Sequence, residues 1–275
     1  MITTSNYNKQ HPLRVFEAFA GYGSQSLAFK YLKEKHPEFD FKVVGYSEIE
    51  PSAIQAYRLL HGWDIPNFGD VTRIDWNEVL DFDFISWSSP CQDFSNAGLR
   101  QGGEEGSGTR SSLIFQEKRM LAVKKPKYVM LENVKGLLSG KVKPDIGGQV
   151  LDLYNQSVSQ GISPTIKTTI DTSNMTFVTT MNKEIIHTAP NGKKYSIYIR
   201  KYTPRDCFRL MGVHEDDIDK LLSKEKDGSP IICKSKLYAL ARNSIVTNCL
   251  TAMFEELIFP SGNHYNDKNG QLSLF

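Results

Sequence analysis

A cysteine that directly follows an apolar run is the strongest chemical signal in this chain. Residues 88–95 read SSPCQDFS, and Cys91 comes just after the apolar run 82–87. Such a run is typical of a buried strand, and parallel sheets gather their reactive groups at the carboxyl ends of strands. The position therefore favours a nucleophilic thiol, with a small buried cysteine as the ordinary alternative.

A carboxylate follows another predicted strand and completes a chemically useful pair. Glu132 opens the triplet ENV at the end of a strand predicted over 128–132. A thiolate can add to C6 of a cytosine if a carboxylic acid holds or protonates N3, and C5 then becomes carbanion-like enough to accept a methyl group. Cys91 and Glu132 on neighbouring strand ends would suit this reaction, given a sulfonium methyl donor nearby. A helix-capping acid is the alternative interpretation of Glu132.

Two glycines mark a candidate cofactor loop near the amino terminus. Gly21 and Gly23 lie between a strand predicted over 13–20 and a helix predicted over 25–35. Glycines there let the backbone approach a ligand, and the start of a helix offers free amide donors to an anionic group. Ser26 replaces the third glycine of a dinucleotide fingerprint, which argues against NAD or FAD.

Two acids end the next β-units in the same layer. Glu48 ends a strand predicted over 42–48 and could accept hydrogen bonds from a ribose diol. Asp70 ends a short third unit and could bind an adenine amino group. Each acid alone would be interpreted as a solvated loop or cap residue, but their register with the glycine loop favours a nucleoside-type cofactor.

The order of the predicted elements indicates an α/β fold. Strands and helices alternate through the first half of the chain, which is typical of an open, mostly parallel sheet covered on both faces. Ligands should then gather at the carboxyl ends of the strands. Strands are expected over 13–20, 42–48, 82–87 and 128–132, with the short unit ending near Asp70, and helices over 25–35, 51–60 and 113–123.

The second half of the chain has a different character. The glycine-rich segment 96–112 follows Cys91 and is interpreted as a lid over the site rather than a linker. Short β-rich pieces are expected over 165–200, with a hairpin around Asn191-Gly192. Helices are expected to resume at the cap formed by Thr203 and Asp206 and to end with one over 245–258. The predicted regions are a catalytic and cofactor-binding domain over 1–140, a β-rich region over 141–202 and C-terminal helices over 203–275 that return to the catalytic domain.

Composition sets limits on the class of protein. With 275 residues, 40% of them apolar, the chain can bury a large core, and its net charge of +2 is too mild to indicate nucleic-acid binding without a local basic patch. The four cysteines lack CxxC spacing, so neither a disulfide framework nor a metal site is predicted. No apolar run approaches the roughly 18 residues of a membrane span, and a reducing cytoplasm is the expected location.

The motifs together resemble those of the cytosine-C5 DNA methyltransferase family. FAGYGS (19–24) is similar to the family's cofactor loop, SEIE (47–50) to its ribose-binding segment and GDV (69–71) to its adenine-binding segment. SSPCQDFS resembles the PCQ nucleophile motif, and ENV resembles the glutamate motif. Further similar segments are GSGTRSSL (106–113), RKYTPRDCFRLMG (200–212) and YALARNSI (238–245), and the resemblance covers 13–135 and 200–259.

The resemblance implies a role for each matching residue. Cys91 would be the nucleophile and Glu132 the partner of N3, acting on a cytosine flipped out of double-stranded DNA. The fold would be the Rossmann-like methyltransferase fold, with 141–202 as a reduced target-recognition region, and the methyl donor would be S-adenosylmethionine. The residues expected to bind it are Phe19, Ala20, Gly21, Tyr22, Gly23, Glu48, Ile49, Asp70, Val71, Pro90, Asn243 and Ser244. Those expected to contact DNA phosphates are Ser95, Arg100 and Arg110.

The chain departs from the family after the ENV motif. The family's QxRxR motif and two further strands are not visible, and Arg242 replaces the glycine that usually precedes Asn243-Ser244. Three activities therefore stay open: a small DNA methyltransferase, a truncated relative that holds cofactor or DNA and needs a partner, and an RNA cytosine methyltransferase. The sheet edge left after the last predicted strand would need the piece 165–200, a second chain or self-association to cover it.

Overall fold

The computed structural model describes residues 6–89, 113, 116–132, 177–178, 184–188, 194–200, 202–260, 265–266 and 272–273. The chain divides into two compact units. The first comprises Met1–Ile162 and Ile245–Phe275, and the second comprises Ser163–Ser244. The functional division into catalytic, recognition and C-terminal regions stays a prediction.

A four-stranded parallel sheet forms the centre of the first unit. It is built from β1 (Leu13–Ala18), β2 (Phe41–Ser47), β3 (Phe84–Trp87) and β4 (Tyr128–Leu131), in the order β2-β1-β3-β4. At their carboxyl ends, Ala18 of β1 pairs with Trp87 of β3, which in turn pairs with Leu131 of β4. The four strands therefore end at one edge of the sheet, and the predicted α/β class is confirmed.

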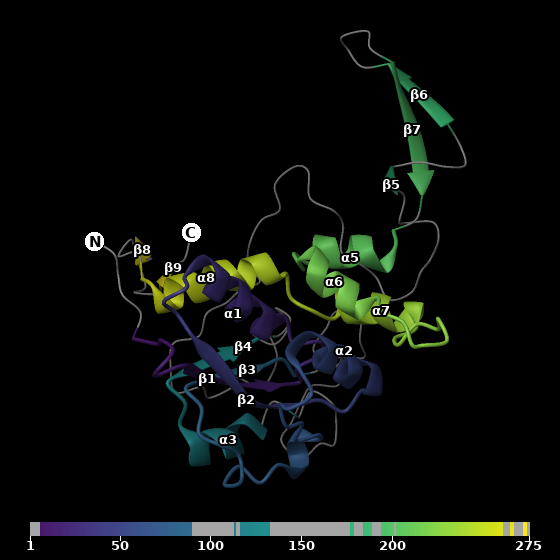
Figure 1. Ribbon diagram of the computed structural model, residues 1–275. Coiled ribbons are helices and arrows are strands. Elements are labelled where there is room, and N and C mark those ends of the chain that lie inside the picture. The colour runs from purple at the N-terminus through teal and green to yellow at the C-terminus, as the bar shows by residue number, and fades with distance from the viewer. Residues whose placement is uncertain are drawn as a thin grey trace, which may run out of the picture. The chain divides into compact units, whose positions relative to one another are not determined.

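Helices cover both faces of this sheet. In Figure 1, α1 (Ser24–Lys35) and α8 (Thr247–Ile258) lie on one face, and α3 (Gln116–Lys124) lies on the other. On the first face, the ring of Phe29 stacks on that of Phe254 with centroids 4.1 Å apart and meets the ring of Phe84 edge-on at 5.1 Å. On the second face, Ile85 and Trp87 are buried in a separate apolar cluster. This alternation along β3 is the period-two pattern of a strand buried on both faces.

Local signals in the sequence explain where α2 (Pro51–His61) begins. The side chain of Glu50 accepts a hydrogen bond of 2.8 Å from the amide of Ala53, and Pro51 occupies the first helical turn. An acceptor at the cap satisfies one of the unpaired amides of the first turn, and proline needs no partner there. The helix therefore starts at Pro51, as the sequence predicts.

The third predicted β-unit is not a strand. The segment before Asp70 makes a single parallel bridge, between Tyr46 and Asn67, and continues into the 3-10 turn η1 (Val71–Arg73). Pro66 has no amide hydrogen, and Gly69 has a φ of 67°, outside the extended range. The two flanking residues thus keep the pairing from extending beyond one bridge.

The second unit contains the predicted hairpin and the predicted cap. Strands β5 (Phe177–Val178), β6 (Glu184–Thr188) and β7 (Lys194–Arg200) form an antiparallel sheet in the order β5-β7-β6. The turn residues Asn191-Gly192 lie outside the described residues. α5 (Pro204–Leu210) begins with a capping box in which Thr203 and Asp206 bond each other's backbone amides, as their spacing predicts. α6 (Glu215–Leu221) and α7 (Lys234–Arg242) follow, and in the first unit β8 (Tyr265–Asn266) pairs with β9 (Leu272–Ser273).

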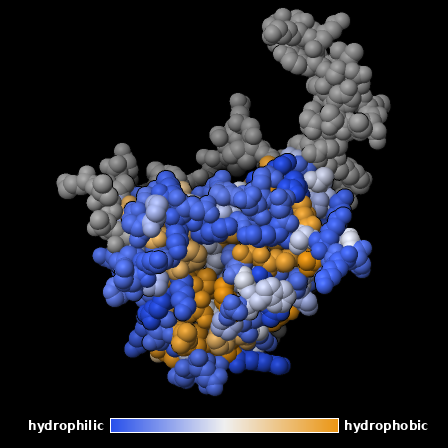
Figure 2. Space-filling model, in the orientation of Figure 1, coloured by the Kyte–Doolittle hydropathy of each residue, from blue (hydrophilic) through white to orange (hydrophobic). Residues whose placement is uncertain are grey.

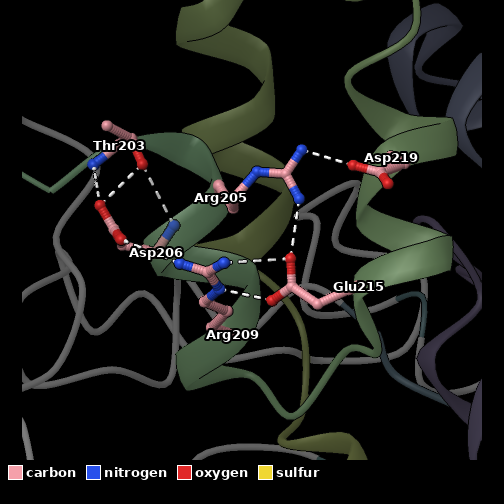
Figure 3. Close-up of polar contacts among 6 residues, drawn as sticks. All are labelled: Thr203, Arg205, Asp206, Arg209, Glu215 and Asp219. Atoms are coloured by element: carbon pink, nitrogen blue, oxygen red, sulfur yellow. Dashed lines mark hydrogen bonds and ion pairs between the residues drawn. The ribbon is translucent and has the colours of Figure 1, made fainter.

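A charge network joins α5 to α6 (Figure 3). Arg205 donates to Glu215 at 2.8 Å and also to Asp219, and Arg209 donates to both oxygens of Glu215. Bidentate contacts of this kind favour arginine, whose planar fork matches a carboxylate. Arg205 and Arg209 of the segment RKYTPRDCFRLMG are thereby paired with acids of the same unit.

The described surface is mostly hydrophilic. On the face shown in Figure 2, hydrophilic residues dominate, and apolar residues gather over the region of the first unit's sheet. Among the large apolar side chains, Ile49 is 69% exposed, next to the predicted ribose-binding acid. Within the described part of the chain, no helix has both the length and the apolar character required to cross a bilayer.

Candidate functional site

The predicted glycine loop lies between β1 and α1 in a conformation that glycine permits. Gly21 has a φ of 58° and Gly23 a φ of 80°, both in the left-handed region. A Cβ atom on Gly23 would lie 2.4 Å from Nε2 of His61 and 2.7 Å from a ring carbon of Tyr57, so only glycine fits. A Cβ atom on Gly21 would meet nothing within 4 Å among the described residues. The loop therefore faces open space at Gly21 and packed side chains at Gly23.

Two contacts fix the loop to neighbouring elements. Nε2 of His61 lies 3.0 Å from the carbonyl oxygen of Tyr22, and because a carbonyl can only accept, Nε2 is the donor. The amide of Ala20 donates to the carbonyl of Ser47 at the end of β2, at 3.1 Å. The side chains of Ala20 and Tyr22 are buried. These two predicted cofactor residues therefore present backbone rather than side chain to any ligand of the loop.

A buried acid that the sequence analysis did not single out, Glu17, binds the start of α1 just after the glycine loop. Glu17 is fully buried and accepts hydrogen bonds from the amide of Ser26 at 3.0 Å, from its hydroxyl at 2.6 Å, and from the hydroxyl of Tyr57. Burial raises the pKa of Glu17, and these donors partly offset the rise. Ser26 thus stands where a dinucleotide fingerprint has glycine because it caps this carboxyl group. Glu17 had no motif to reveal it, since an acid inside a strand is normally interpreted as solvent-facing.

Glu48 and the glycine loop come together as predicted. The carboxylate of Glu48 accepts hydrogen bonds from the amides of Gly21 at 2.9 Å, Ile49 at 2.8 Å and Glu50 at 2.9 Å. An ionised carboxylate has about four acceptor positions, so about one remains for a ligand hydroxyl. Glu48 therefore both shapes the loop and keeps acceptor capacity beside it.

Asp70 lies at the start of η1, one residue before the buried Val71. One of its oxygens, Oδ1, accepts from the amide and the hydroxyl of Thr72 at 2.9 and 2.8 Å. The hydrogen bond from the amide of Thr72 is the main reason that the pKa of Asp70 is lowered. The acid is thus an ionised acceptor near neutral pH, in keeping with a predicted role on an adenine amino group.

The backbone of Phe19 lies in the left-handed region, which usually requires glycine. Its φ is 57°, and its half-buried ring meets the ring of Trp87 edge-on with centroids 5.6 Å apart. A side chain is disfavoured in this region by about 1–2 kcal/mol. Strain of this size marks positions where the surrounding fold dictates the direction of a side chain.

Glu132 follows β4 beside the end of β3. Its amide donates to the carbonyl of Trp87 at 3.1 Å, so the two strand ends lie in register. Burial raises the pKa of Glu132, which favours the protonated carboxylic acid. Cys91 comes four residues after Trp87 in the sequence but lies outside the described residues, as do Pro90, Ser95, Arg100 and Arg110.

Asn243 and Ser244 belong to the second unit, at the end of α7. The amide of Asn243 donates to the carbonyl of Ala239 at 3.0 Å, and the hydroxyl of Ser244 donates to the carbonyl of Ala241 at 2.9 Å. These contacts end the helix. Their predicted role near the methionine end of a cofactor stays a prediction.

The described cysteines show no sign of metal chemistry. Cys207, Cys233 and Cys249 carry free thiols, and burial raises the pKa of Cys207 to about 11. Among the residues that the structure describes, no group of three or more His, Cys, Asp or Glu side chains could hold a metal ion.

Comparison with known families shows which family the chain belongs to. The sequence profile described as "C-5 cytosine-specific DNA methylase" matches residues 13–157, just over half of the chain. The chain belongs to the C-5 cytosine-specific DNA methylase family. The match includes the glycine loop, both acid segments, the PCQ motif and the ENV motif.

Curated members of this methylase family match over different spans. The type II methyltransferase M2.ScrFI of Lactococcus lactis subsp. cremoris is 26% identical over 370 aligned positions that cover 89% of this chain and 99% of the relative. That alignment is longer than the 275 residues of this chain, so part of the relative faces gaps here. The orphan methyltransferase M.Rho11sI of Bacillus phage rho11s is 41% identical over 149 residues, which are 54% of this chain and 27% of the relative. The chain thus matches only about a quarter of the phage protein's length.

Solved structures agree with the methylase fold. The S. pombe Dnmt2 methyltransferase superimposes with a TM-score of 0.57 at 17% identity and covers 90% of this chain and 99% of that one. The Entamoeba histolytica methyltransferase EhMeth gives 0.55 at 14% identity, with 90% and 98% coverage. At these identities the likeness shows the fold alone, and it supports the predicted Rossmann-like methyltransferase architecture.

Proposed function

We propose that the protein transfers a methyl group from S-adenosylmethionine to C5 of a cytosine in double-stranded DNA. The observation that carries the proposal is the register of β3 with β4, in which the amide of Glu132 bonds the carbonyl of Trp87, in a chain of the cytosine-C5 methylase family. The role of Cys91 rests on the PCQ motif that follows β3.

The residues around the glycine loop fit an adenosyl cofactor. The space at Gly21 is open, Glu48 retains about one acceptor position for a ribose hydroxyl, and Asp70 offers an ionised carboxylate to an amino group. S-adenosylmethionine would supply an electrophilic methyl group at this place. Phe19 would contact the adenine, and Ile49, Val71, Pro90, Asn243 and Ser244 complete the proposed set.

The chain's own residues account for activation of the base. The thiolate of Cys91 forms a bond to C6 of the cytosine while the carboxylic acid of Glu132 holds or protonates N3, which takes up the electron density that the addition releases. Burial raises the pKa of Glu132, which favours this protonated form more than in an exposed glutamate. The methyl carbon would pass to C5 as its bond to the cofactor sulfonium breaks, which leaves S-adenosylhomocysteine. Loss of the C5 proton to water and expulsion of the Cys91 thiolate from C6 would then restore the ring, and N3 would return its proton to Glu132.

The target base must leave the helix for this chemistry. C6 is inaccessible in stacked DNA, so a flipped-out cytosine is part of the proposal, at a cost of a few kcal/mol. Ser95, Arg100 and Arg110, in and near the glycine-rich segment 96–112, would contact DNA phosphates as the segment closes. This lid role is inferred from the family resemblance.

Methyl transfer by the nucleophile can be tested directly. The purified protein is incubated with cofactor carrying a tritiated methyl group and with a cytosine-containing duplex, alongside Cys91→Ser and Glu132→Gln. We expect Cys91→Ser to reduce transfer to background and Glu132→Gln to slow it about 10²–10⁴-fold, while both bind S-adenosylhomocysteine like the wild type. A duplex with 5-fluorocytosine should trap the wild type covalently. Transfer that survives in Cys91→Ser would contradict the proposal.

The other two activities are separated by the same preparation. A truncated relative that needs a second chain would bind cofactor or duplex without turnover until its partner is added, and robust turnover by the isolated chain would dispose of that alternative. An RNA methyltransferase would label tRNA in preference to the duplex. DNA is favoured over RNA because the matching family profile describes DNA methylases.

A further inference from the structure

The side chain of Asn67 joins the backbone of Glu48 to that of Gly69, the residue before Asp70. Oδ1 of Asn67 accepts from the amide of Glu48 at 3.1 Å and from the amide of Gly69 at 3.0 Å, and Nδ2 donates to the carbonyl of Glu48 at 3.0 Å. Both acceptor positions of the side-chain oxygen are thus filled by backbone donors, and a carbonyl faces the nitrogen. This pattern fixes the orientation of the amide, because the reverse orientation would set two donors against the NH2 group.

Backbone hydrogen bonds on both sides of Asn67 hold this segment against β2. The amide of Tyr46 donates to the carbonyl of Pro66 at 3.0 Å, and the amide of Phe68 donates to the carbonyl of Tyr46 at 2.8 Å. These two bonds hold the chain against the end of β2, and the side chain of Asn67 then bridges forward to Gly69. The side chain of Asn67 therefore links the residue after β2 to Gly69, beside a second link in which the hydroxyl of Ser47 donates to the carbonyl of Gly69 at 2.6 Å.

We propose that Asn67 is a positioning residue that fixes the spacing between Glu48 and Asp70 and so couples recognition of the ribose to recognition of the base. The inference rests on the proposed function, because it assumes an adenosyl ligand on these two acids. Asparagine suits the position chemically. It supplies two acceptor positions and a donor without charge, whereas aspartate would lack the donor and add a third negative group beside Glu48 and Asp70.

Asn67→Ala and Asn67→Asp test this role through ligand discrimination. Calorimetric titration measures the Kd of S-adenosylhomocysteine and of its 2′-deoxyribose analogue for each protein. In the wild type, loss of the hydroxyl should weaken binding about 10-fold or more, since the lost bond involves a charged acceptor. In Asn67→Ala, we expect weaker binding of S-adenosylhomocysteine and a ratio between the two ligands that falls towards one. Asn67→Asp keeps the acceptor oxygens, so its ratio of the two Kd values should lie between those of the wild type and of Asn67→Ala.

The ratio separates positioning from simple destabilisation. A partly unfolded variant would weaken both ligands equally and leave their ratio unchanged. Asn77→Ala is a matched control on the same connecting segment, because the side chain of Asn77 donates only to Asp75 among the contacts of the described residues, at 3.0 Å. That control should keep the wild-type ratio.

The outcomes distinguish this inference from the proposed function. Wild-type binding with a clear preference for the ribose hydroxyl, and the same preference in both Asn67 variants, would overturn the role of Asn67 and leave the methyltransferase proposal standing. No binding of S-adenosylhomocysteine by the wild type would overturn both. A wild type that binds both ligands equally would remove Glu48 from the ribose and would also overturn the inference.

Discussion

The two glycines of the proposed cofactor loop have different surroundings, so single substitutions at Gly21 and Gly23 should have different effects on stability and binding. Gly21→Ala places its methyl group in open space and should cost about 1–2 kcal/mol of folding free energy for the left-handed backbone. Gly23→Ala adds a clash with His61 to the same strain, so it should cost more than about 2 kcal/mol. Urea unfolding measures both values, and titration with S-adenosylhomocysteine measures binding.

The two variants should also differ in how binding fails. Gly21→Ala should remain folded and lose affinity, because its Cβ occupies the space assigned to the ligand. Gly23→Ala should lose stability first. Equal unfolding free energies for the two variants would contradict the packing described around His61 and Tyr57.

Glu117 should make stability depend on pH. This acid on α3 is 3% exposed, its Oε1 has no hydrogen-bond partner among the described residues, and burial raises its pKa from 4.5 to about 7. Between these two pH values the folded protein binds more protons than the unfolded chain, so stability falls as pH rises from about 4.5 to about 7 and stays low above that. Glu117→Gln removes this titration. Relative to the wild type, the variant should gain up to about 3 kcal/mol on going from pH 4.5 to pH 8.

Urea unfolding of both proteins at several pH values is the measurement for Glu117. The difference between the two unfolding free energies matters, because the other carboxylates titrate alike in both proteins. A difference that does not change with pH would show that Glu117 ionises normally in the folded state.

At the scale of elements, α8 is held to α1 by a buried aromatic stack and by more exposed polar contacts of Glu255. The two kinds of contact should differ in how much they stabilise the fold. Phe254 is 2% exposed and stacks on Phe29 at 4.1 Å, whereas the side chain of Glu255 is 28% exposed and bonds Lys35 at 2.6 Å and His36 at 2.8 Å. Phe254→Ala should cost about 3–5 kcal/mol, and Glu255→Gln less than about 1 kcal/mol. Thermal and urea unfolding measure both. A larger loss in Glu255→Gln would mean that the ion pairs dominate this joint.

Elements with a clear apolar pattern could be predicted from the sequence. β1, β2, β3 and β4 lie within two residues of their expected bounds, because runs such as 82–87 are apolar on both faces. The capping box of Thr203 was readable because both partners lie within one helical turn. The prediction of a third β-unit as a strand was wrong. An apolar segment does not by itself reveal that Pro66 and Gly69 limit its pairing with β2 to a single bridge.

The candidate site divides in the same way. Glu48 is beside the glycine loop as expected, since strand order places the ends of β1 and β2 together. Glu17 and Asn67 escaped sequence reasoning because their partners, Ser26, Tyr57 and the amide of Glu48, are contacts that only the fold creates. The predicted roles of Cys91 and of the phosphate-binding residues remain predictions.

At the scale of the whole molecule, charge gives little long-range attraction to DNA. The 33 basic residues are balanced by 31 acidic ones, and Arg205 and Arg209 are engaged by acids of α6. Binding to a phosphate backbone would then depend on local groups, such as Arg100 and Arg110 in the proposal. The relative M2.ScrFI aligns over more positions than this chain has, so part of that relative faces gaps here.

The left-handed backbone of Phe19 has a consequence for laboratory evolution. An aromatic residue at a φ of 57° is a standing cost of about 1–2 kcal/mol that glycine would relieve. Phe19→Gly would also give up the contact of the ring with Trp87 and add conformational freedom to the unfolded chain, so a selection that rewards heat resistance alone should keep the aromatic residue in spite of its strained backbone.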